Sequence, residues 1–162
     1  PSLQWLEEFP NLILTRTFSK AYGLAGLRVG YAVCRPEVAD LLNRVRQPFN
    51  VNSLALAAAT AALDDGDFLA ETKSLNDAGM AQLIEGFKQL GLDWIPSAGN
   101  FVAVRVAPNG DAGPAFQALL RKGVIVRPVG NYGMPEYLRV SIGLPEQNAR
   151  CLAALSEILG AK

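Results

Sequence analysis

Two apolar runs joined by a glycine-rich connection constrain the fold of this chain more than any other feature. Residues 11–17 (Asn-Leu-Ile-Leu-Thr-Arg-Thr) and residues 28–34 (Arg-Val-Gly-Tyr-Ala-Val-Cys) have the length and apolar content of buried strands. The connection between them carries one lysine, Lys20, among hydroxyl and small side chains. The pattern therefore predicts that Lys20 lies on a loop that leaves the end of a strand.

The rest of the chain predicts two domains. We expect a helical segment at 3–9, a helix from Pro36 to about Arg46, a second one, which Ser53 can cap, to about Leu63, and a long helix at 67–90 that ends at Gly91. Shorter elements follow: strands at 93–95, 101–106, 124–128 and 137–142, and helices at 114–122 and 146–159. We place the domain boundary inside the long helix, which gives domains at 1–75 and 76–162, the second a small α+β domain.

Composition excludes several classes of function. Lys plus Arg and Asp plus Glu both total 15 in 162 residues, so no excess of basic charge indicates nucleic acid. No stretch of about 18 uncharged apolar residues could cross a bilayer, and no leader pattern opens the chain. These features predict a cytoplasmic protein whose partner is a small molecule, without nucleic acid or membrane binding.

The chain has no histidine, and its two cysteines, Cys34 and Cys151, lie far apart. Catalytic Ser-His-Asp and Cys-His arrangements are therefore impossible within this sequence, and no metal site is expected. We interpret both cysteines as buried free thiols. A catalytic base must then be a lysine, a carboxylate or a tyrosine.

The segment Thr17-Phe-Ser-Lys-Ala-Tyr-Gly-Leu-Ala-Gly-Leu-Arg-Val-Gly30 has the side chains that a pyridoxal phosphate site needs. Lys20 offers an amine for the cofactor's aldehyde and a base for proton transfer at the substrate Cα. Thr17 and Ser19 can donate hydroxyl hydrogen bonds to the cofactor phosphate, and Arg28 adds a permanently charged planar fork. A tight loop with a solvated lysine remains the alternative, whereas the glycine spacing fits neither a dinucleotide fold nor a P-loop.

The residues from Thr17 to Gly26 also resemble, position by position, the cofactor-lysine signature of the class-II aminotransferases of fold type I. The continuation at 27–31 (Leu-Arg-Val-Gly-Tyr) and the segment at 46–53 are similar to the histidinol-phosphate branch of that family. The resemblance extends over essentially the whole chain. It implies the C-terminal part of an α/β, pyridoxal-phosphate-binding large domain, followed by a small α+β C-terminal domain.

The resemblance also implies a role for each residue of the segment. Lys20 would bond covalently to the cofactor, Ser19 and Arg28 would bind its phosphate, and Thr17 would lie close to it. In that family the N-terminal half supplies the aromatic ring stacked on the cofactor, the aspartate at the pyridine nitrogen, and a tyrosine and an asparagine at the cofactor hydroxyl. None of these precedes Pro1, so we expect the chain to be a C-terminal fragment of such an enzyme.

Two arginines interrupt apolar strand patterns near the end of the chain, Arg127 at 124–128 and Arg139 at 137–143. Each is either on the solvated face of its strand or directed at an anion, which a guanidinium fork binds well. In the resembling family, the position of Arg139 binds the substrate α-carboxylate, and the position of Arg127 is similar to a ligand of the substrate phosphate. Further polar residues are open between turn or capping roles and substrate contacts: Asn50, Asn52, Ser53, Asn100 and Tyr132.

The function that this resemblance implies is amino transfer between glutamate/2-oxoglutarate and imidazole-acetol phosphate/histidinol phosphate, in histidine biosynthesis, by a homodimer. Two alternatives within the fold use the same Lys20 site: an aromatic or broad-specificity aminotransferase, and a threonine-phosphate decarboxylase. A third alternative is a noncatalytic domain fragment that binds no cofactor, since affinity would rest on Lys20 and the phosphate ligands alone.

Overall fold

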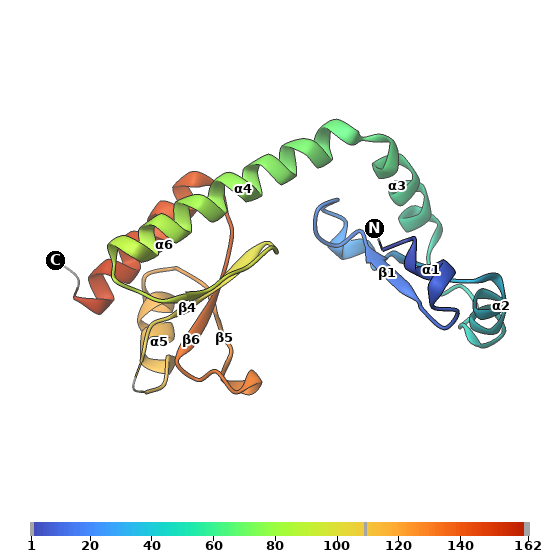
Figure 1. Cartoon of the computed structure of the whole chain (residues 1–162). Coiled ribbons are helices and arrows are strands. Elements are labelled where there is room, and N and C mark those ends of the chain that lie inside the picture. The colour runs from blue at the N-terminus through green and yellow to red at the C-terminus, as the bar shows by residue number, and fades with distance from the viewer. Residues whose placement is uncertain (1, 109, 161–162) are drawn as a thin grey trace. The chain divides into compact units, whose positions relative to one another are not determined.

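The computed structural model describes residues 2–108 and 110–160 and divides the chain into two compact units (Figure 1). The first unit comprises residues 1–72 and the second residues 73–162. The division falls within a long helix, α4 (Gly66–Gln89), three residues before the predicted boundary at 75/76. The predicted helix at 67–90 and its end at Gly91, which has a positive φ of 66°, are confirmed.

The first unit is built around a two-stranded antiparallel sheet. Strand β1 (Leu14–Thr17) pairs with β2 (Gly30–Val33), so that Leu14 faces Val33 and Thr17 faces Gly30. The helices of this unit are α1 (Trp5–Glu8), the 3-10 turn η1 (Ala25–Leu27), α2 (Pro36–Val45), α3 (Ser53–Asp64) and the beginning of α4.

Both strands of the first unit are shorter and more exposed than the sequence predicts. Six of the eight strand residues are exposed, and only Phe18 and Val29, just beyond the strand ends, are buried. A two-stranded sheet buries residues only where another element covers it, and here the buried cluster forms beside α3, with Ala55 and Ala59. The prediction of two buried strands is therefore wrong for the residues that the structure describes.

The N-terminus of α3 also corrects a prediction. The capping residue is Asn52, whose Oδ1 accepts a hydrogen bond of 2.8 Å from the Ala55 backbone N–H, and Ser53 is the first helical residue. Asparagine and serine cap helices about equally well, so the sequence alone does not separate the two neighbours.

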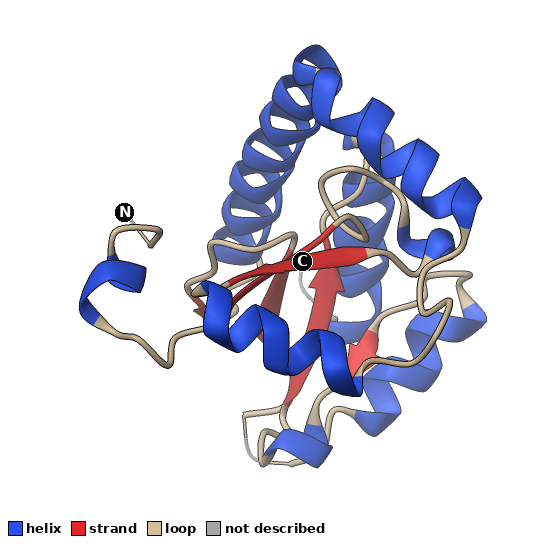
Figure 2. Cartoon of the chain, turned by 90° about the vertical axis from the view of Figure 1, so that its right-hand side faces the viewer, coloured by secondary structure: helices blue, strands red, loops and turns tan. Residues whose placement is uncertain are grey.

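The second unit contains a four-stranded antiparallel sheet, whose strands are drawn in red in Figure 2, and helices that pack against it. The strand order is β3-β4-β6-β5. The elements are β3 (Trp94–Ile95), β4 (Phe101–Arg105), α5 (Gly113–Arg121), β5 (Arg127–Pro128), the 3-10 turn η2 (Gly130–Tyr132), β6 (Tyr137–Ser141) and α6 (Pro145–Leu159). This arrangement confirms a small α+β unit. The predicted strand at 124–128 is reduced to two residues, the second a proline without an N–H for a ladder.

The core of the second unit follows the alternation of its strands. Val102 and Val104 of β4 and Leu138 and Val140 of β6 are buried against one another and against α4, α5 and α6. Period-2 alternation places Phe101, Ala103, Arg139 and Ser141 on the opposite face. We call this opposite face, which also carries Arg127, the open face.

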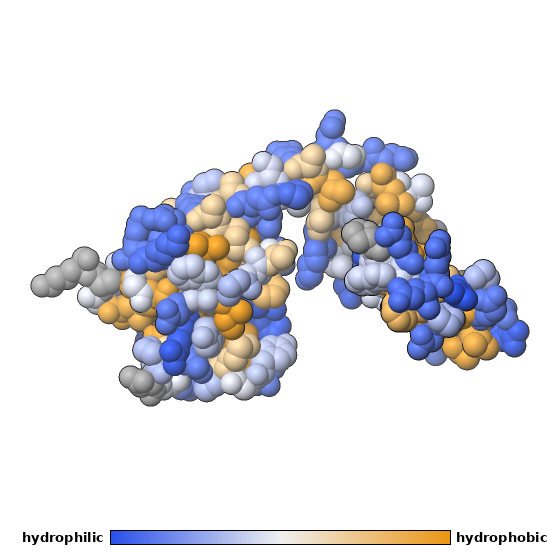
Figure 3. Space-filling view, viewed as in Figure 1, coloured by the Kyte–Doolittle hydropathy of each residue, from blue (hydrophilic) through white to orange (hydrophobic). Residues whose placement is uncertain are grey.

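Large apolar side chains remain exposed in the first unit. Figure 3 shows apolar side chains at the surface around α2 and α3. They belong to both helices and to the loop between them: Leu41, Leu42, Val45, Phe49, Leu54, Leu56 and Leu63. Phe49 is 97% exposed and has a positive φ of 56°, a conformation that few residues other than glycine and asparagine adopt. Arg46 orders this loop by donating to the side chains of Asn43 and Asn50, both at 3.0 Å.

Candidate functional site

Lys20 lies on a tight turn directly after β1. The backbone N–H of Gly23 donates to the Lys20 carbonyl at 2.9 Å, and that of Leu24 donates to the Phe18 carbonyl at 2.9 Å. Gly23 has a φ of 69°, which closes the turn without the steric cost that a side chain would add. Phe18 is buried and anchors the loop, whereas Lys20 is exposed. No residue within 2–108 or 110–160 forms a hydrogen bond or ion pair with the Lys20 ammonium group.

Thr17, Ser19 and Arg28 lie at the same end of the two-stranded sheet as Lys20. The Thr17 Oγ1 accepts a hydrogen bond of 3.0 Å from the Ser19 backbone N–H, which fixes the start of the loop. The Phe18 N–H donates to the Val29 carbonyl at 3.2 Å and continues the strand register one residue further. The next positions in that register are Ser19 and Arg28, so the fold brings two of the predicted phosphate ligands to neighbouring places.

Arg28 has an unusual backbone conformation for its residue type. Its φ of 55° and ψ of 47° lie in the left-handed region, which costs a residue with a side chain about 1 kcal/mol or more. The side chain is exposed, and its Nη1 donates to the Ala25 carbonyl at 2.8 Å. A glycine would adopt this backbone more easily, so Arg28 is a candidate for a role that depends on its side chain. Such backbone outliers concentrate at functional sites.

The segment from Thr17 to Gly30 needs a residue without a side chain at position 30. A Cβ atom at this position would lie 2.6 Å from the Arg16 carbonyl oxygen, closer than real side chains approach backbone. Gly30 faces Thr17 in the strand register, so the pairing that brings the two ends of the loop together depends on its missing side chain.

The second unit brings Arg127 and Arg139 together. They are direct partners in the β5–β6 ladder, so both side chains stand on the open face, with Cβ atoms about 4.5–5.5 Å apart. Like charges directly opposite one another destabilise a sheet. Across residues 2–108 and 110–160, no aspartate or glutamate forms an ion pair with either arginine. The arrangement therefore has the composition of an anion site.

Each of these arginines has an aromatic neighbour. The Arg127 Nη2 donates to the Tyr132 Oη at 3.1 Å, and its guanidinium carbon lies 5.7 Å from the centre of that ring. The Arg139 guanidinium carbon lies 4.7 Å from the centre of the Phe101 ring. The Arg139 Nε is buried and has no hydrogen-bond partner within the described part of the chain. Sequence reasoning missed Phe101, because alternation indicates its face but no local signal reveals which residue of another strand it meets.

The remaining polar candidates have local structural roles. Asn52 caps α3, and Asn50 accepts a hydrogen bond from Arg46. The Asn100 carbonyl accepts the backbone N–H of Ile142 at 2.9 Å, which continues the β4–β6 ladder. Tyr132 alone of this group contacts a predicted substrate residue.

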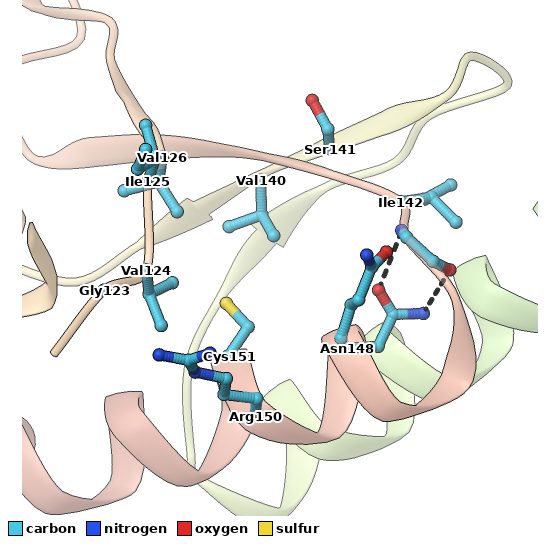
Figure 4. Close-up of a pocket in the computed structure, with 12 residues that line it drawn as sticks. Gly123, Val124, Ile125, Val126, Val140, Ser141, Ile142, Asn148, Arg150 and Cys151 are labelled. Atoms are coloured by element: carbon cyan, nitrogen blue, oxygen red, sulfur yellow. Dashed lines mark hydrogen bonds between the residues drawn. The ribbon is translucent and has the colours of Figure 1, made fainter.

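A cavity of about 430 Å³ lies in the second unit, away from the predicted residues (Figure 4). Val124, Val126, Val140 and Cys151 contribute to its apolar wall, and neither Arg127 nor Arg139 lines it. Burial raises the pKa of the Cys151 thiol to about 11, so this cysteine is an unreactive core residue.

Beside this cavity, the buried side chain of Asn148 holds the turn after β6. It accepts from the Gly143 N–H at 2.9 Å and donates to the Gly143 carbonyl at 3.0 Å, as the dashed lines in Figure 4 show. It also donates to Gln82 of α4 at 3.1 Å. These hydrogen bonds fix the turn that joins β6 to α6 beside the cavity.

Two observations concern metals and membranes. Within residues 2–108 and 110–160, no group of three or more histidine, cysteine, aspartate or glutamate side chains could hold a metal ion. None of the helices described is long and apolar enough to cross a membrane.

Comparison with known proteins places these features in a family. Residues 1–155 match the family model described as aminotransferase class I and II. Among curated proteins, histidinol-phosphate aminotransferase 2 of Pseudomonas aeruginosa is 69% identical over 157 residues, which cover 97% of this chain and 42% of the relative. Histidinol-phosphate aminotransferase 2 of Ralstonia nicotianae is 62% identical, with coverage of 98% and 42%. The chain thus spans about two fifths of the length of these relatives.

Solved structures agree on the fold. The histidinol-phosphate aminotransferase of Sinorhizobium meliloti in complex with pyridoxal-5'-phosphate superposes with a TM-score of 0.85 at 34% identity, over 96% of this chain and 44% of that one. The histidinol-phosphate aminotransferase of Clostridium acetobutylicum gives a TM-score of 0.91 over 100% of this chain and 50% of that one. At 22% identity the second likeness supports the fold alone.

Proposed function

This chain belongs to the class I and II aminotransferase family, and from that premise we propose that it is part of a pyridoxal-phosphate-dependent histidinol-phosphate aminotransferase. The observation that carries the proposal is Lys20, an exposed lysine with no partner among residues 2–108 and 110–160, on a turn that also presents Thr17, Ser19 and Arg28. The activity is proposed for the complete enzyme, meaning a protein of the relatives' length that contains this chain. The first unit would then belong to the cofactor-binding domain and the second would be the small domain.

The side chains at this turn fit pyridoxal phosphate. The cofactor's aldehyde requires a free amine, which the Lys20 side chain provides. Its phosphate requires hydroxyl donors and a fixed cation, which Ser19, Thr17 and Arg28 supply from one end of the sheet. Arg28 has a left-handed backbone, which glycine adopts more easily than arginine. An arginine in this strained conformation supports a role for its side chain in binding the phosphate.

The bound cofactor supplies the electron sink that weakens the bond between the substrate Cα and its hydrogen. Lys20 would hold the cofactor through its amine and would be the base that takes the proton from the substrate Cα. Arg28 and Ser19 would hold the cofactor phosphate and so keep the reacting atoms close to Lys20.

We propose Arg139 as the ligand of the substrate α-carboxylate and Arg127 as the ligand of the substrate phosphate and of glutamate's second carboxylate. Their pairing across β5 and β6 places both arginines on one face of the sheet, and no acidic residue among those described pairs with either. Such a pair suits a doubly charged anion such as a phosphate ester. This arrangement favours a phosphorylated substrate over phenylalanine, which has no second anion.

Turnover measurements in the complete enzyme test this proposal. We expect transfer of the amino group from histidinol phosphate to 2-oxoglutarate, with a kcat/KM well above that for phenylalanine. Equal values for the two amino donors would instead support a broad-specificity aminotransferase. For the 162-residue chain alone, the absorbance spectrum with added pyridoxal phosphate decides whether Lys20 binds the cofactor without the rest of the enzyme, or whether the chain is a noncatalytic fragment.

We also propose that the complete enzyme is a cytoplasmic homodimer. The exposed apolar side chains of α2, α3 and the loop at 46–52 form a surface that a partner subunit could cover, which supports this proposal. Both cysteines are free, as is usual in a reducing compartment. Sedimentation of the Phe49→Asn variant tests the dimer: weaker self-association than in the parent supports this surface, and an unchanged dissociation constant contradicts it.

A further inference from the structure

Among the described residues, no hydrogen bond or ion pair fixes the Arg139 guanidinium on the open face of the second unit. The three helices of this unit pack on the face that carries Leu138 and Val140, whereas Arg139 is only partly buried on the other. No carboxylate within the described residues pairs with it, and its buried Nε lacks an acceptor. Something other than an ion pair must hold this guanidinium in place.

Phe101 lies where it can hold the Arg139 guanidinium in place. It lies on β4, two residues before Ala103, which stands directly opposite Arg139 in the ladder. The alanine side chain is small, so the arginine can extend along the open face to the Phe101 ring, whose centre is 4.7 Å from the guanidinium carbon. The contact therefore follows from strand register and from the small residue between the two partners.

An aromatic ring is better suited than an acidic partner to hold the Arg139 guanidinium while its N–H groups stay available to a substrate anion. An arginine donates hydrogen bonds from the edge of its planar guanidinium, whereas an aromatic ring attracts the face of the group. A carboxylate partner would occupy the N–H edge that a substrate anion needs. The Phe101 ring contacts the guanidinium without offering an acceptor oxygen, so the Nη donors of Arg139 stay available to an anion.

We infer that Phe101 is a positioning residue, which holds the plane of Arg139 so that its N–H edge meets the anion of the substrate. The inference rests on the proposed function only for the identity of that anion. The contact between ring and guanidinium is a property of the second unit by itself.

The test compares variants of the complete enzyme. Phe101→Leu keeps apolar bulk and removes the ring, and we expect KM for glutamate to rise about three- to tenfold, the effect of one partly shielded cation–π contact. The kcat value should stay within about twofold, and cofactor affinity should not change. Phe101→Tyr, which keeps the ring, should restore KM. Tyr137→Leu, which removes another aromatic side chain of the open face, is the matched control and should leave KM unchanged.

A double-mutant cycle separates positioning from a general loss of structure. In the Arg139→Ala background, Phe101→Leu should raise KM no further, because the group that the ring positions is gone. Additive losses, or a failure of Phe101→Tyr to restore KM, would overturn the inference.

If the unsubstituted enzyme transfers no amino group, the proposed function fails, and the same cycle is then measured with inorganic phosphate by calorimetry. Coupling between Phe101 and Arg139 in phosphate affinity supports the inference in that case. Additive effects, or no phosphate binding, overturn it.

Discussion

The two units of this chain differ in how much of their apolar surface they bury. Among the described residues, the second unit has a core of thirteen buried residues, ten of them on β4, β6, α4, α5 and α6 and three on the adjoining loops. The first unit has a buried cluster of four, Phe18, Val29, Ala55 and Ala59, and exposes large apolar side chains along α2 and α3. The second unit therefore has the core of an independent domain, whereas the first has apolar surface suited to contact with other protein.

The two units also hold their candidate functional side chains in different ways. In the first unit, Lys20 and Arg28 lie on a loop fixed by backbone hydrogen bonds, by two glycines and by one buried aromatic ring. In the second unit, Arg127 and Arg139 stand on strands whose other face is buried in the core. Changes at the loop should affect chemistry with little effect on folding, and changes beneath the sheet should affect both.

The largest expected effect is the loss of activity on replacing Lys20. In the complete enzyme, Lys20→Ala removes the bond to the cofactor and the base, so we expect amino transfer to fall by at least about 10²–10⁴-fold. The unfolding free energy should stay close to that of the parent, because Lys20 is exposed. Lys73→Ala is the matched control: this lysine is exposed and pairs with Asp77, and its loss should leave turnover unchanged. Turnover of Lys20→Ala within tenfold of the parent contradicts the assignment.

A core substitution in each unit measures the difference in packing directly. Phe87→Ala empties a fully buried site in the second unit and should lower its unfolding free energy by about 3–5 kcal/mol. Phe18→Ala should cost the first unit less, because a four-residue cluster beside exposed surface can collapse more readily. Each unit contains one of the two tryptophans, Trp5 and Trp94, so urea unfolding followed by fluorescence in Trp→Phe variants reports each unit separately. Equal losses would contradict the comparison.

Replacing Arg127 should have a smaller effect on catalysis. Arg127→Ala removes one anion contact, and we expect kcat/KM for histidinol phosphate to fall about ten- to a hundredfold. Arg139→Ala should impair every substrate that carries an α-carboxylate. Arg121→Ala, at the exposed end of α5, is the control for loss of a positive charge in the same unit. An unaffected histidinol-phosphate half-reaction would remove Arg127 from the site and favour the aromatic aminotransferase.

Arg28 should affect cofactor retention with little change in chemistry. Arg28→Lys keeps the charge and loses the fork, so we expect cofactor affinity to fall about ten- to a hundredfold in a dialysis titration. Arg28→Gly should weaken the cofactor at least as much, yet leave the unfolding free energy of the first unit unchanged or slightly higher, because glycine accepts the left-handed backbone. Unchanged cofactor affinity in both variants would exclude Arg28 from the phosphate site.

The smallest expected effect on stability is at Phe49. This side chain is almost fully exposed on a left-handed backbone that asparagine tolerates, so Phe49→Asn should change the unfolding free energy of the isolated chain by no more than about 0.5 kcal/mol. Urea unfolding of the two chains provides the measurement. A loss above 1 kcal/mol would show that Phe49 packs within its own chain.

Local patterns predicted most of the elements. The long helix, its end at Gly91 and the alternating strands of the second unit follow from periodicity and from residues with special backbone freedom. The strands of the first unit were predicted less well. An apolar run indicates burial only if another layer covers it, and most of β1 and β2 is exposed among the residues described.

By itself, the sequence determined that Lys20, Thr17, Ser19 and Arg28 lie on one glycine-rich connection between strands, since these residues are neighbours along the chain. Only the tertiary structure decided that Arg127 faces Arg139 and that Arg139 lies over Phe101. Strand register depends on which faces of distant segments are buried together, and a shift by one residue would turn every side chain to the other face. Positions far apart in the sequence become partners through that shared burial, which no local pattern contains.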